Sequence, residues 1–341
     1  MRRLVVLMLA GLLAGPALAQ QGAGLVAGPA GTAAPLIAGD LAAEGAACGI
    51  AITPMPSAGS MANAAAVRDR PGVQLGLVQE DALEYIRTLA PDSAALRRMA
   101  QGLRVVMPLH AQAVHLLARR ELTELADLDG ARVSLGEDGS GTRLTAGLVL
   151  DLAGVEPGAR LEDLAPQAAL DALLAGEIDA MFLVDAVPSP LMAEAALDPA
   201  RFHLLALTAP VLTALYTPLR ITPDAYAVAP DGVETVAVRS VLMTFDFSAT
   251  GNAYHRASCA AVGDVAQLVL SRIAPLQAGG HPAWQSVDLT DLPADWLVSP
   301  CALAGLEPGR ELTCEDASSA TPAPAAPNAL FLERICARGG C

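Results

Sequence analysis

Short apolar segments typical of strands alternate with longer segments typical of helices along most of the chain. In its first part the pattern predicts helices at 33–47, 60–67 and 80–89 and strands at 50–53 and 74–78. Such alternation favours a parallel or mixed sheet that helices cover on both faces, which is an α/β fold. Two more strands, 103–107 and 113–118, are expected on either side of Pro108 and His110.

The same alternation starts again after residue 130, which predicts a second lobe. Strands are predicted at 131–135, 178–184 and 202–207, and helices at 140–153, 168–175 and 189–196. The chain is expected to pass between the lobes near 108–113 and 207–214. The β-rich stretch 234–245 and the helical stretch 257–276 then return to the first lobe. We assign 22–110 and 208–300 to lobe 1, 111–207 to lobe 2, and 301–341 to a cysteine-bearing extension with an Ala/Pro-rich linker.

The first 19 residues have the features of a secretory signal peptide. Arg2 and Arg3 precede an apolar run over 4–14, and Ala17 and Ala19 supply the small residues of a cleavage site before Gln20. The run is shorter than the roughly 20 residues that a membrane-spanning helix needs. No later segment is expected to span a bilayer either, so we expect an exported, periplasmic protein.

Charge composition narrows the classes of function. The chain has 36 acidic and 21 basic residues, a formal net charge of −15, and every basic residue is an arginine. An acidic protein is a poor match for nucleic acid, because such binding depends on neutralising phosphates. The absence of lysine excludes mechanisms that need a Schiff-base lysine, a phosphate-loop lysine or a lysine general base.

Six cysteines follow the signal segment, at positions 48, 259, 301, 314, 336 and 341. In an oxidising compartment an even number favours disulfides, and six cysteines allow fifteen pairings. Local closure favours Cys301 with Cys314 and Cys336 with Cys341, which leaves Cys48 for Cys259. A zinc site made of the last four cysteines is a weaker alternative, because no C-x-x-C pair is present.

Polar turns follow three of the predicted strands. The segment 133–142 reads VSLGEDGSGT, so a buried strand runs into a turn that opens a helix at Ser140, Gly141 and Thr142. Free N–H groups in the first turn of such a helix favour a bound anion, and Arg143 would add a bidentate partner for a carboxylate. The alternative is that Ser140 or Thr142 only caps the helix and that Arg143 lies in solvent.

The two other turns belong to the first lobe. The turn 57–60 leads to Ser60 and Asn63, and a further strand ends at Gln79. Ligands of open α/β sheets bind beyond the carboxyl ends of the strands. Three polar strand ends in series therefore predict a small-ligand site, although capping by Ser60 and a surface amide at Gln79 are plainer alternatives.

Three segments together resemble a known family. They are GSMANAAAVRDRPGVQLGLVQED (59–81), DLDGARVSLGEDGSGTRLTAGLVLDLAGV (127–155) and ALLAGEIDAMFLVDAVPSPLMAEAA (172–196). They resemble the TAXI-type solute receptors of tripartite ATP-independent periplasmic (TRAP) transporters, over a region from about Gly24 to Thr244. The resemblance implies a two-lobed periplasmic binding protein-like fold with a ligand cleft between the lobes. It also implies a small carboxylate ligand, an amino acid such as glutamate or an organic acid, which the protein delivers to a TRAP-type membrane permease.

The resemblance also assigns residues to the cleft. It implies that Ser60, Asn63 and Gln79 bind the ligand from the first lobe and that Ser140, Gly141 and Thr142 bind it from the second. Thr145 and the segment 184–190, with Pro188, are expected to line the far wall. Arg143 is added to this set as the counter-ion predicted from the turn. No cofactor and no metal are expected.

An enzyme is not expected from these residues. None of the five histidines stands in an H-E-x-x-H motif or another close metal spacing. Ser140 lies in D-G-S-G, which lacks the first glycine of a nucleophile elbow. The alternatives to a transport receptor are an exported sensor or adaptor whose C-terminal extension engages a partner and, less favoured, a periplasmic hydrolase that acts through Ser140.

Overall fold

A computed structural model describes residues 22–89, 91–161, 163–249, 251–307, 309 and 312–314. The predicted signal peptide, most of the C-terminal extension and the predicted pair Cys336–Cys341 lie outside these residues.

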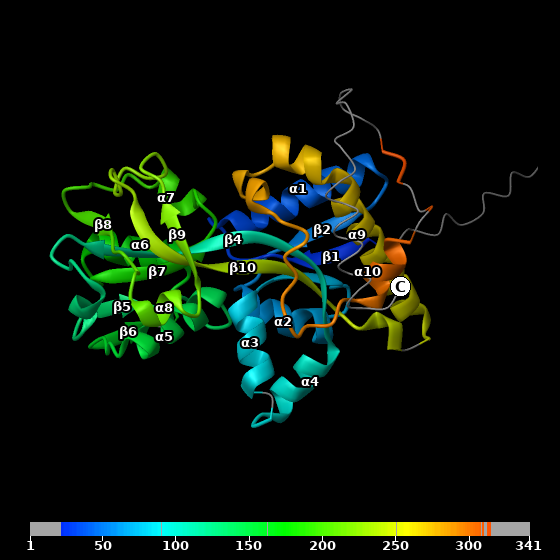
Figure 1. Cartoon of the computed structure of the whole chain (residues 1–341), viewed down its shortest axis with the longest axis horizontal. Helices are drawn as coiled ribbons and strands as arrows, with labels where there is room; N and C mark the ends of the chain where they lie inside the picture. The colour runs from blue at the N-terminus through cyan, green and yellow to red at the C-terminus, as the bar shows by residue number, and fades with distance from the viewer. Residues whose placement is uncertain are drawn as a thin grey trace, which may run out of the picture.

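The described residues form one ten-stranded sheet: eight strands lie in the order β2-β1-β3-β10-β4-β7-β5-β6, and the remaining two pair at its side, β8 with β4 and β9 with β10. The strands are β1 (Ala23–Val26), β2 (Ile52–Met55), β3 (Leu75–Gln79), β4 (Leu103–Arg119), β5 (Arg132–Ser134), β6 (Ala159–Leu161), β7 (Ala180–Asp185), β8 (Phe202–Leu204), β9 (Thr217–Ile221) and β10 (Val233–Phe245). The long strands β4 and β10 pair antiparallel and run through the middle of the molecule (Figure 1). They make the sheet continuous between two groups of mainly parallel strands.

Helices cover the sheet. The α-helices are α1 (Ala33–Ala47), α2 (Ser60–Asp69), α3 (Glu80–Leu89), α4 (Ala94–Gly102), α5 (Gly141–Ala153), α6 (Pro166–Ala175), α7 (Pro190–Glu194), α8 (Pro210–Thr213), α9 (Ala253–Gly279) and α10 (Pro300–Gly305). Three short 3-10 helices are η1 (Leu125–Leu128), η2 (Phe247–Ala249) and η3 (Pro282–Ser286). The predicted helices at 33–47 and 80–89 are found with the expected bounds, and most of the other predicted elements differ by a few residues at their ends.

The hydrophobic core divides the molecule into two lobes. One cluster joins β1 and β3 with α1, α3 and α9. Two further clusters cover opposite faces of the second lobe's sheet: Phe182 and Val184 of β7 belong to one, and Met181 and Leu183 to the other. Since successive strand residues point to opposite faces, β7 is buried on both sides, as expected for a parallel sheet between helix layers. The predicted α/β, two-lobed fold is therefore confirmed (Figure 1).

One predicted break in the sheet is wrong. The two strands expected around Pro108 are a single strand, β4. A proline in a central strand removes a ladder hydrogen bond and is tolerated mainly at edges and bulges. Pro108 pairs with Val241 next to a register shift between Arg239 and Val241 of β10, so the irregularity lies where the missing N–H would otherwise interrupt the ladder.

The return of the chain to the first lobe also differs from the expected position. Leu212, Tyr216 and Val236 belong to one cluster of the second lobe, and Ile221 and Tyr226 to the other. In Figure 1, β9 and α8 lie in the same half of the molecule as β5, β6 and α5. We therefore propose that the second passage between the lobes lies within β10 rather than near 207–214, and that residues 208–238 belong to lobe 2.

Helix α9 has a length and composition that would also suit a membrane span, and among the described residues it is the one helix of which this is true. Its residues Val262, Val265 and Val269 are buried in the first cluster, together with residues of α1 and β1. We interpret α9 as the central core helix of lobe 1.

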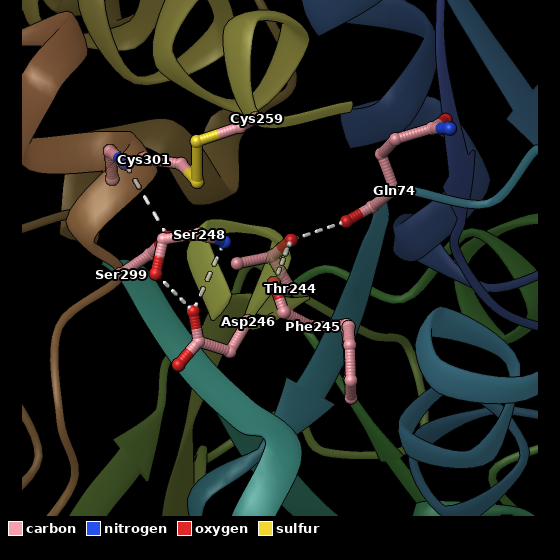
Figure 2. Close-up of a disulfide and its surroundings, with 9 residues drawn as sticks. Gln74, Thr244, Phe245, Asp246, Ser248, Cys259, Ser299 and Cys301 are labelled. Atoms are coloured by element: carbon pink, nitrogen blue, oxygen red, sulfur yellow. Dashed lines mark hydrogen bonds between the residues drawn. A yellow bond between two sulfur atoms is a disulfide. The ribbon is translucent and has the colours of Figure 1, made fainter. Parts of the chain in front are cut away.

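Two disulfides join the C-terminal part of the described chain to lobe 1. Cys259 of α9 pairs with Cys301 of α10 (Figure 2), and Cys48 pairs with Cys314. The predicted pairs Cys301–Cys314 and Cys48–Cys259 are wrong, and cysteines held in these disulfides do not form the alternative zinc site. The reason lies in the packing of α10 on α9: a Cβ atom on Gly305 would lie 2.1 Å from the carbonyl oxygen of Gly263, so only glycines allow this approach.

We expect the double substitution Cys259→Ser, Cys301→Ser to lower the free energy of unfolding by about 4 kcal/mol. The reason is that the disulfide closes a loop with a sequence separation of 42 residues, and the loss of that closure enlarges the unfolded ensemble. Urea unfolding with and without reductant measures the change. Peptide mapping that joins Cys48 to Cys259 would contradict the structure.

Candidate functional site

A cavity of about 50 Å³ lies between the lobes, where the carboxyl ends of strands from both lobes meet. Its polar lining combines Thr32, Ser60 and Gln79 from lobe 1, Glu137, Ser140, Gly141, Thr142 and Asp185 from lobe 2, and Gln112 and Ser240 from the two connecting strands. Five of the nine predicted ligand-binding residues therefore line this cavity: Ser60, Gln79, Ser140, Gly141 and Thr142.

Helix α5 points its N-terminus at this cavity. The Oγ atom of Ser140 accepts a hydrogen bond from the backbone N–H of Arg143 at 3.0 Å, so the predicted capping is present. The Oγ1 atom of Thr142 accepts one from the N–H of Val184 at 3.1 Å, which fixes the helix to β7. Within the described part of the chain, the N–H groups of Gly141 and Thr142 have no protein acceptor. They are the donors that remain for a ligand.

The two lobes touch at this helix end. The Oγ atom of Ser60 accepts a hydrogen bond from the N–H of Gln79 at 3.1 Å, and both side chains face α5. A Cβ atom on Gly141 would lie 1.7 Å from Oε1 of Gln79 and 2.6 Å from Oγ of Ser60. Gly59, with φ of 127°, lies close to the same helix end, since a Cβ there would lie 3.3 Å from the N atom of Gly141. The structure is thus a closed form in which glycines permit the contact.

The other four predicted residues lie outside the cavity lining. Asn63 donates through Nδ2 to the carbonyl oxygens of Ala27 at 2.8 Å and Leu77 at 2.7 Å, so it links β1 to β3. Arg143 pairs with the carboxylate of Asp138, which is 92% exposed, and the guanidinium is not part of the wall. Pro188 follows a cis peptide bond and is half-buried.

Thr145 has a different role from the one expected. Its Oγ1 atom donates to Oδ2 of Asp81 at 2.6 Å, and the hydroxyl of Tyr216 donates to the same oxygen at 3.3 Å. Asp81 belongs to lobe 1, whereas the two hydroxyls belong to lobe 2. Burial raises the pKa of Asp81 to about 6, and the bonds from Thr145 and Tyr216 oppose that rise. This group is a hydrogen-bonded bridge between the lobes.

Asp185 lies in the segment 184–190 that the resemblance assigns to the far wall, although it is not one of the nine predicted ligand-binding residues. It is 1% exposed, and its Oδ1 and Oδ2 atoms accept from the N–H of Ala33 at 3.0 and 3.2 Å. Oδ1 also accepts from the N–H of Ala186 at 2.9 Å. A carboxylate of lobe 2 therefore occupies the N-terminus of α1 in lobe 1, whose own N-cap makes no side-chain bond. From sequence, an aspartate at a strand end is equally well explained as solvated or as a local cap.

Two amide side chains also face the cavity without a partner. The Oε1 atoms of Gln79 and Gln112 are buried and accept no hydrogen bond from any described residue. Buried acceptors of this kind are costly unless a ligand or water supplies a donor. The amide of Gln112 was not singled out from the sequence, because it lies inside β4 and not in a turn.

The molecule has two α/β lobes that are joined by long paired strands, and polar strand ends and helix N-termini face each other across a cavity between them. This architecture is the two-lobed fold of periplasmic binding proteins. The chain belongs to the NMT1-like family, whose profile matches residues 32–255.

Several solved structures are similar to this chain. The periplasmic binding protein BugD is 13% identical, with a TM-score of 0.47, and the match covers 77% of this chain and 84% of that one. MatC from Rhodopseudomonas palustris with bound malate is 19% identical, with a TM-score of 0.46 over 75% and 88%. The GluR0 ligand-binding core from Nostoc punctiforme in complex with L-glutamate is 16% identical, with a TM-score of 0.42 over 80% and 98%.

We expect Gly141→Ala to disfavour the closed form without unfolding either lobe. The added methyl group would overlap Gln79 and Ser60 across the cleft. Small-angle X-ray scattering should show a larger radius of gyration than in the wild type. Gly147→Ala is the matched control, because a Cβ there meets nothing within 4 Å. Equal radii for the two variants would contradict the proposed contact.

We expect Asp185→Asn to weaken the dependence of stability on pH between about pH 4 and pH 6. Burial raises the pKa of Asp185 to about 6 in the folded protein. The folded state therefore holds the proton more tightly than the unfolded state, and this contribution is present at low pH and is lost as the pH rises through 6. It amounts to about 3 kcal/mol. Urea unfolding at four pH values measures it.

Asp179 gives the contrasting case for the same measurement. Its hydrogen-bonded pairing with Arg132 lowers the pKa of the Asp179 carboxyl. Its stabilisation is therefore present at neutral pH and is lost as the pH falls through that lowered pKa. If Asp185→Asn and Asp179→Asn altered the pH profile in the same direction, the assigned burial of Asp185 would be wrong.

Proposed function

We propose that the protein is a periplasmic solute-binding protein that captures a small carboxylate, of which an amino acid fits best, in the cleft between its lobes. The main support is that unpaired hydrogen-bond donors and unpaired acceptors both line the cavity. The N–H groups of Gly141 and Thr142 lack an acceptor among the described residues, and the Oε1 atoms of Gln79 and Gln112 lack a donor. A ligand with an anionic end and a donor end would satisfy both.

The charges of the lining favour an amino acid over a dicarboxylic acid. Glu137 and Asp185 are its charged side chains, and neither an arginine nor a histidine belongs to the lining. Backbone N–H groups at a helix N-terminus stabilise an anion by about 0.3–2 kcal/mol. One carboxylate can bind there, whereas a second would face acidic side chains. An ammonium group at that position would instead meet carboxylate and amide oxygens.

Closure of the lobes provides the mechanism of capture. The ligand contacts Gln79 and Ser60 of one lobe and α5 of the other, so it binds the closed form more tightly than an open one. Binding therefore shifts the population towards the closed form. We propose that the closed complex delivers its solute to a membrane permease of the TRAP type, in line with the resemblance to TAXI-type receptors, and that residues 1–19 direct export to the periplasm.

The same contacts favour binding over hydrolysis. The Ser140 hydroxyl accepts from the N–H of Arg143, and among the residues that line the cavity there is no histidine to act as its general base. A sensor or adaptor would use the same cleft, and the loss of transport in a deletion strain would distinguish a receptor from it.

The proposal predicts that one amino acid raises the Tm of the mature protein. At a concentration of 100 times Kd the stabilisation is about 2.7 kcal/mol, which corresponds to a shift of roughly 4 °C for a chain of this length. A thermal-shift screen of amino acids, dicarboxylic acids and their amides measures it. The double variant Ser140→Ala, Thr142→Val should lose the shift, because it alters the helix end that holds the carboxylate.

Ser271→Ala, on the exposed side of α9, is the control and should respond as the wild type does. A shift with dicarboxylic acids alone would reject the amino acid. No shift with any carboxylate, or a full shift in the double variant, would reject the helix end as the anion site.

A further inference from the structure

A second and larger cavity, of about 710 Å³, lies on the opposite face of the connecting strands. Ala111 of β4 and Arg239 of β10 line it, whereas their neighbours Gln112 and Ser240 line the interlobe cleft. Successive residues of a strand point to opposite faces, so the two cavities are separated by the strand pair. They share no lining residue. We call this second cavity the rear groove.

Both lobes contribute apolar walls to the rear groove. Tyr85 and Leu89 come from α3 of lobe 1, and Trp296 comes from the segment after η3. Leu148 and Leu152 come from α5 of lobe 2, and Leu215 and Leu219 come from the region of β9. Leu215 is 66% exposed, so its side chain is accessible from solvent. The volume lies in the range of small-molecule sites, roughly 300–1,000 Å³.

Acidic side chains surround these apolar walls. Glu80, Glu84, Asp288, Asp291 and Asp295 all line the rear groove. Arg239 is the one basic residue in the lining, and it is already paired with Asp291 at 2.8 Å and with Glu80 at 3.6 Å. Arg87, outside the lining, pairs with Glu84 at 2.8 Å and with Asp295 at 3.8 Å. With Asp81 included, six carboxylates still face two arginines, so the groove combines an apolar floor with an excess of negative charge that complements a cation with an apolar body.

Asp81 supplies the specific point of attachment. It lies in the wall of the rear groove, where its Oδ2 atom accepts from Thr145 and Tyr216. Its Oδ1 atom is buried and has no partner among the described residues. A buried carboxylate oxygen without a donor is costly, and an amine placed beside it would provide both the donor and the opposite charge.

We propose that the rear groove is a binding site for a small amphipathic amine, whose ammonium group pairs with Asp81 and the acidic rim while its apolar body packs on Leu148, Leu152 and Leu215. The site is separate from the solute cleft. Because its walls come from α3 in one lobe and α5 in the other, its occupant contacts both lobes beside the bridge from Asp81 to Thr145.

The test compares three probes of equal chain length by isothermal titration calorimetry near neutral pH. Hexylamine is cationic, hexanol is neutral and hexanoate is anionic. We expect hexylamine to bind, hexanol to bind at least about tenfold more weakly, and hexanoate to show no binding, because the rim repels it. Equal affinity for hexylamine and hexanol, or binding of hexanoate, would overturn the proposal.

Matched variants locate the site. Asp81→Asn keeps the shape of the side chain and should weaken hexylamine binding at least about tenfold. Leu215→Ser changes an exposed residue, so the protein should fold, and it should also weaken binding. Asp69→Asn removes the same charge from the end of α2, away from the groove, and should bind as the wild type does.

Three outcomes would count against the site. Binding that is unchanged in both Asp81→Asn and Leu215→Ser would place the amine elsewhere. Binding that is weakened equally in Asp69→Asn would show that net charge alone is responsible. A dimer in light scattering that Leu215→Ser dissociates would assign the groove to a second copy of the chain. The cleft variant Ser140→Ala, Thr142→Val should bind hexylamine normally, which separates this test from that of the solute site.

Discussion

The antiparallel pairing of β4 with β10 is the constraint on which the rest of the structure depends. The ladder runs from Ala113 opposite Ala237 to Leu103 opposite Phe245, and β10 also pairs with β3 in lobe 1 and with β9 in lobe 2. The lobes are thus joined by a strand pair whose backbone hydrogen bonds are shared with both sheets. Because neighbouring residues of this pair face opposite sides, it places amide and hydroxyl groups in the cleft and Ala111 and Arg239 in the rear groove.

Two buried carboxylates hold the lobes together on either side of this strand pair. Asp185 of lobe 2 accepts from the N-terminus of α1 in lobe 1, and Asp81 of lobe 1 accepts from Thr145 and Tyr216 in lobe 2. Burial raises the pKa of each carboxyl to about 6, which shows that desolvation outweighs the hydrogen bonds that each receives. An ionised carboxylate is costly to bury unless donors contact it, so each carboxylate fits only the one arrangement of the lobes that supplies its donors. The two carboxylates therefore fix the geometry of the closed form more than they add to its stability.

Much of the fold follows from the sequence, because local periodicity determines it. Helix α1 begins and ends where its apolar spacing predicts. Ser60 and Gln79, which follow β2 and β3, meet because these strands run parallel in one sheet, and Ser140 faces them across the cleft. The features that were missed depend on partners far away in the chain. Ala33 and Asp185 are 152 residues apart, and nothing near either residue indicates the other. The same holds for Cys48 and Cys314, since local closure favours neighbours while the packing of α10 on α9 decides the pairing.

Arg143 shows that a charged residue close to the cleft in sequence need not contribute its charge to the cleft. The sequence places a guanidinium three residues after Ser140, yet a helix residue at that position turns away from the end of its own helix, and Asp138 pairs with it at the surface. The carboxylate of Asp185 meanwhile fills the N-terminus of α1, so one of the positive helix ends is neutralised by the protein itself. What remains for a solute is the end of α5, next to acidic and amide oxygens. We propose that a cleft with one positive helix end and several acceptors selects its ligand by the distance between the ligand's positive and negative groups. The strand pair behind the cleft would keep the distance between the matching protein groups constant.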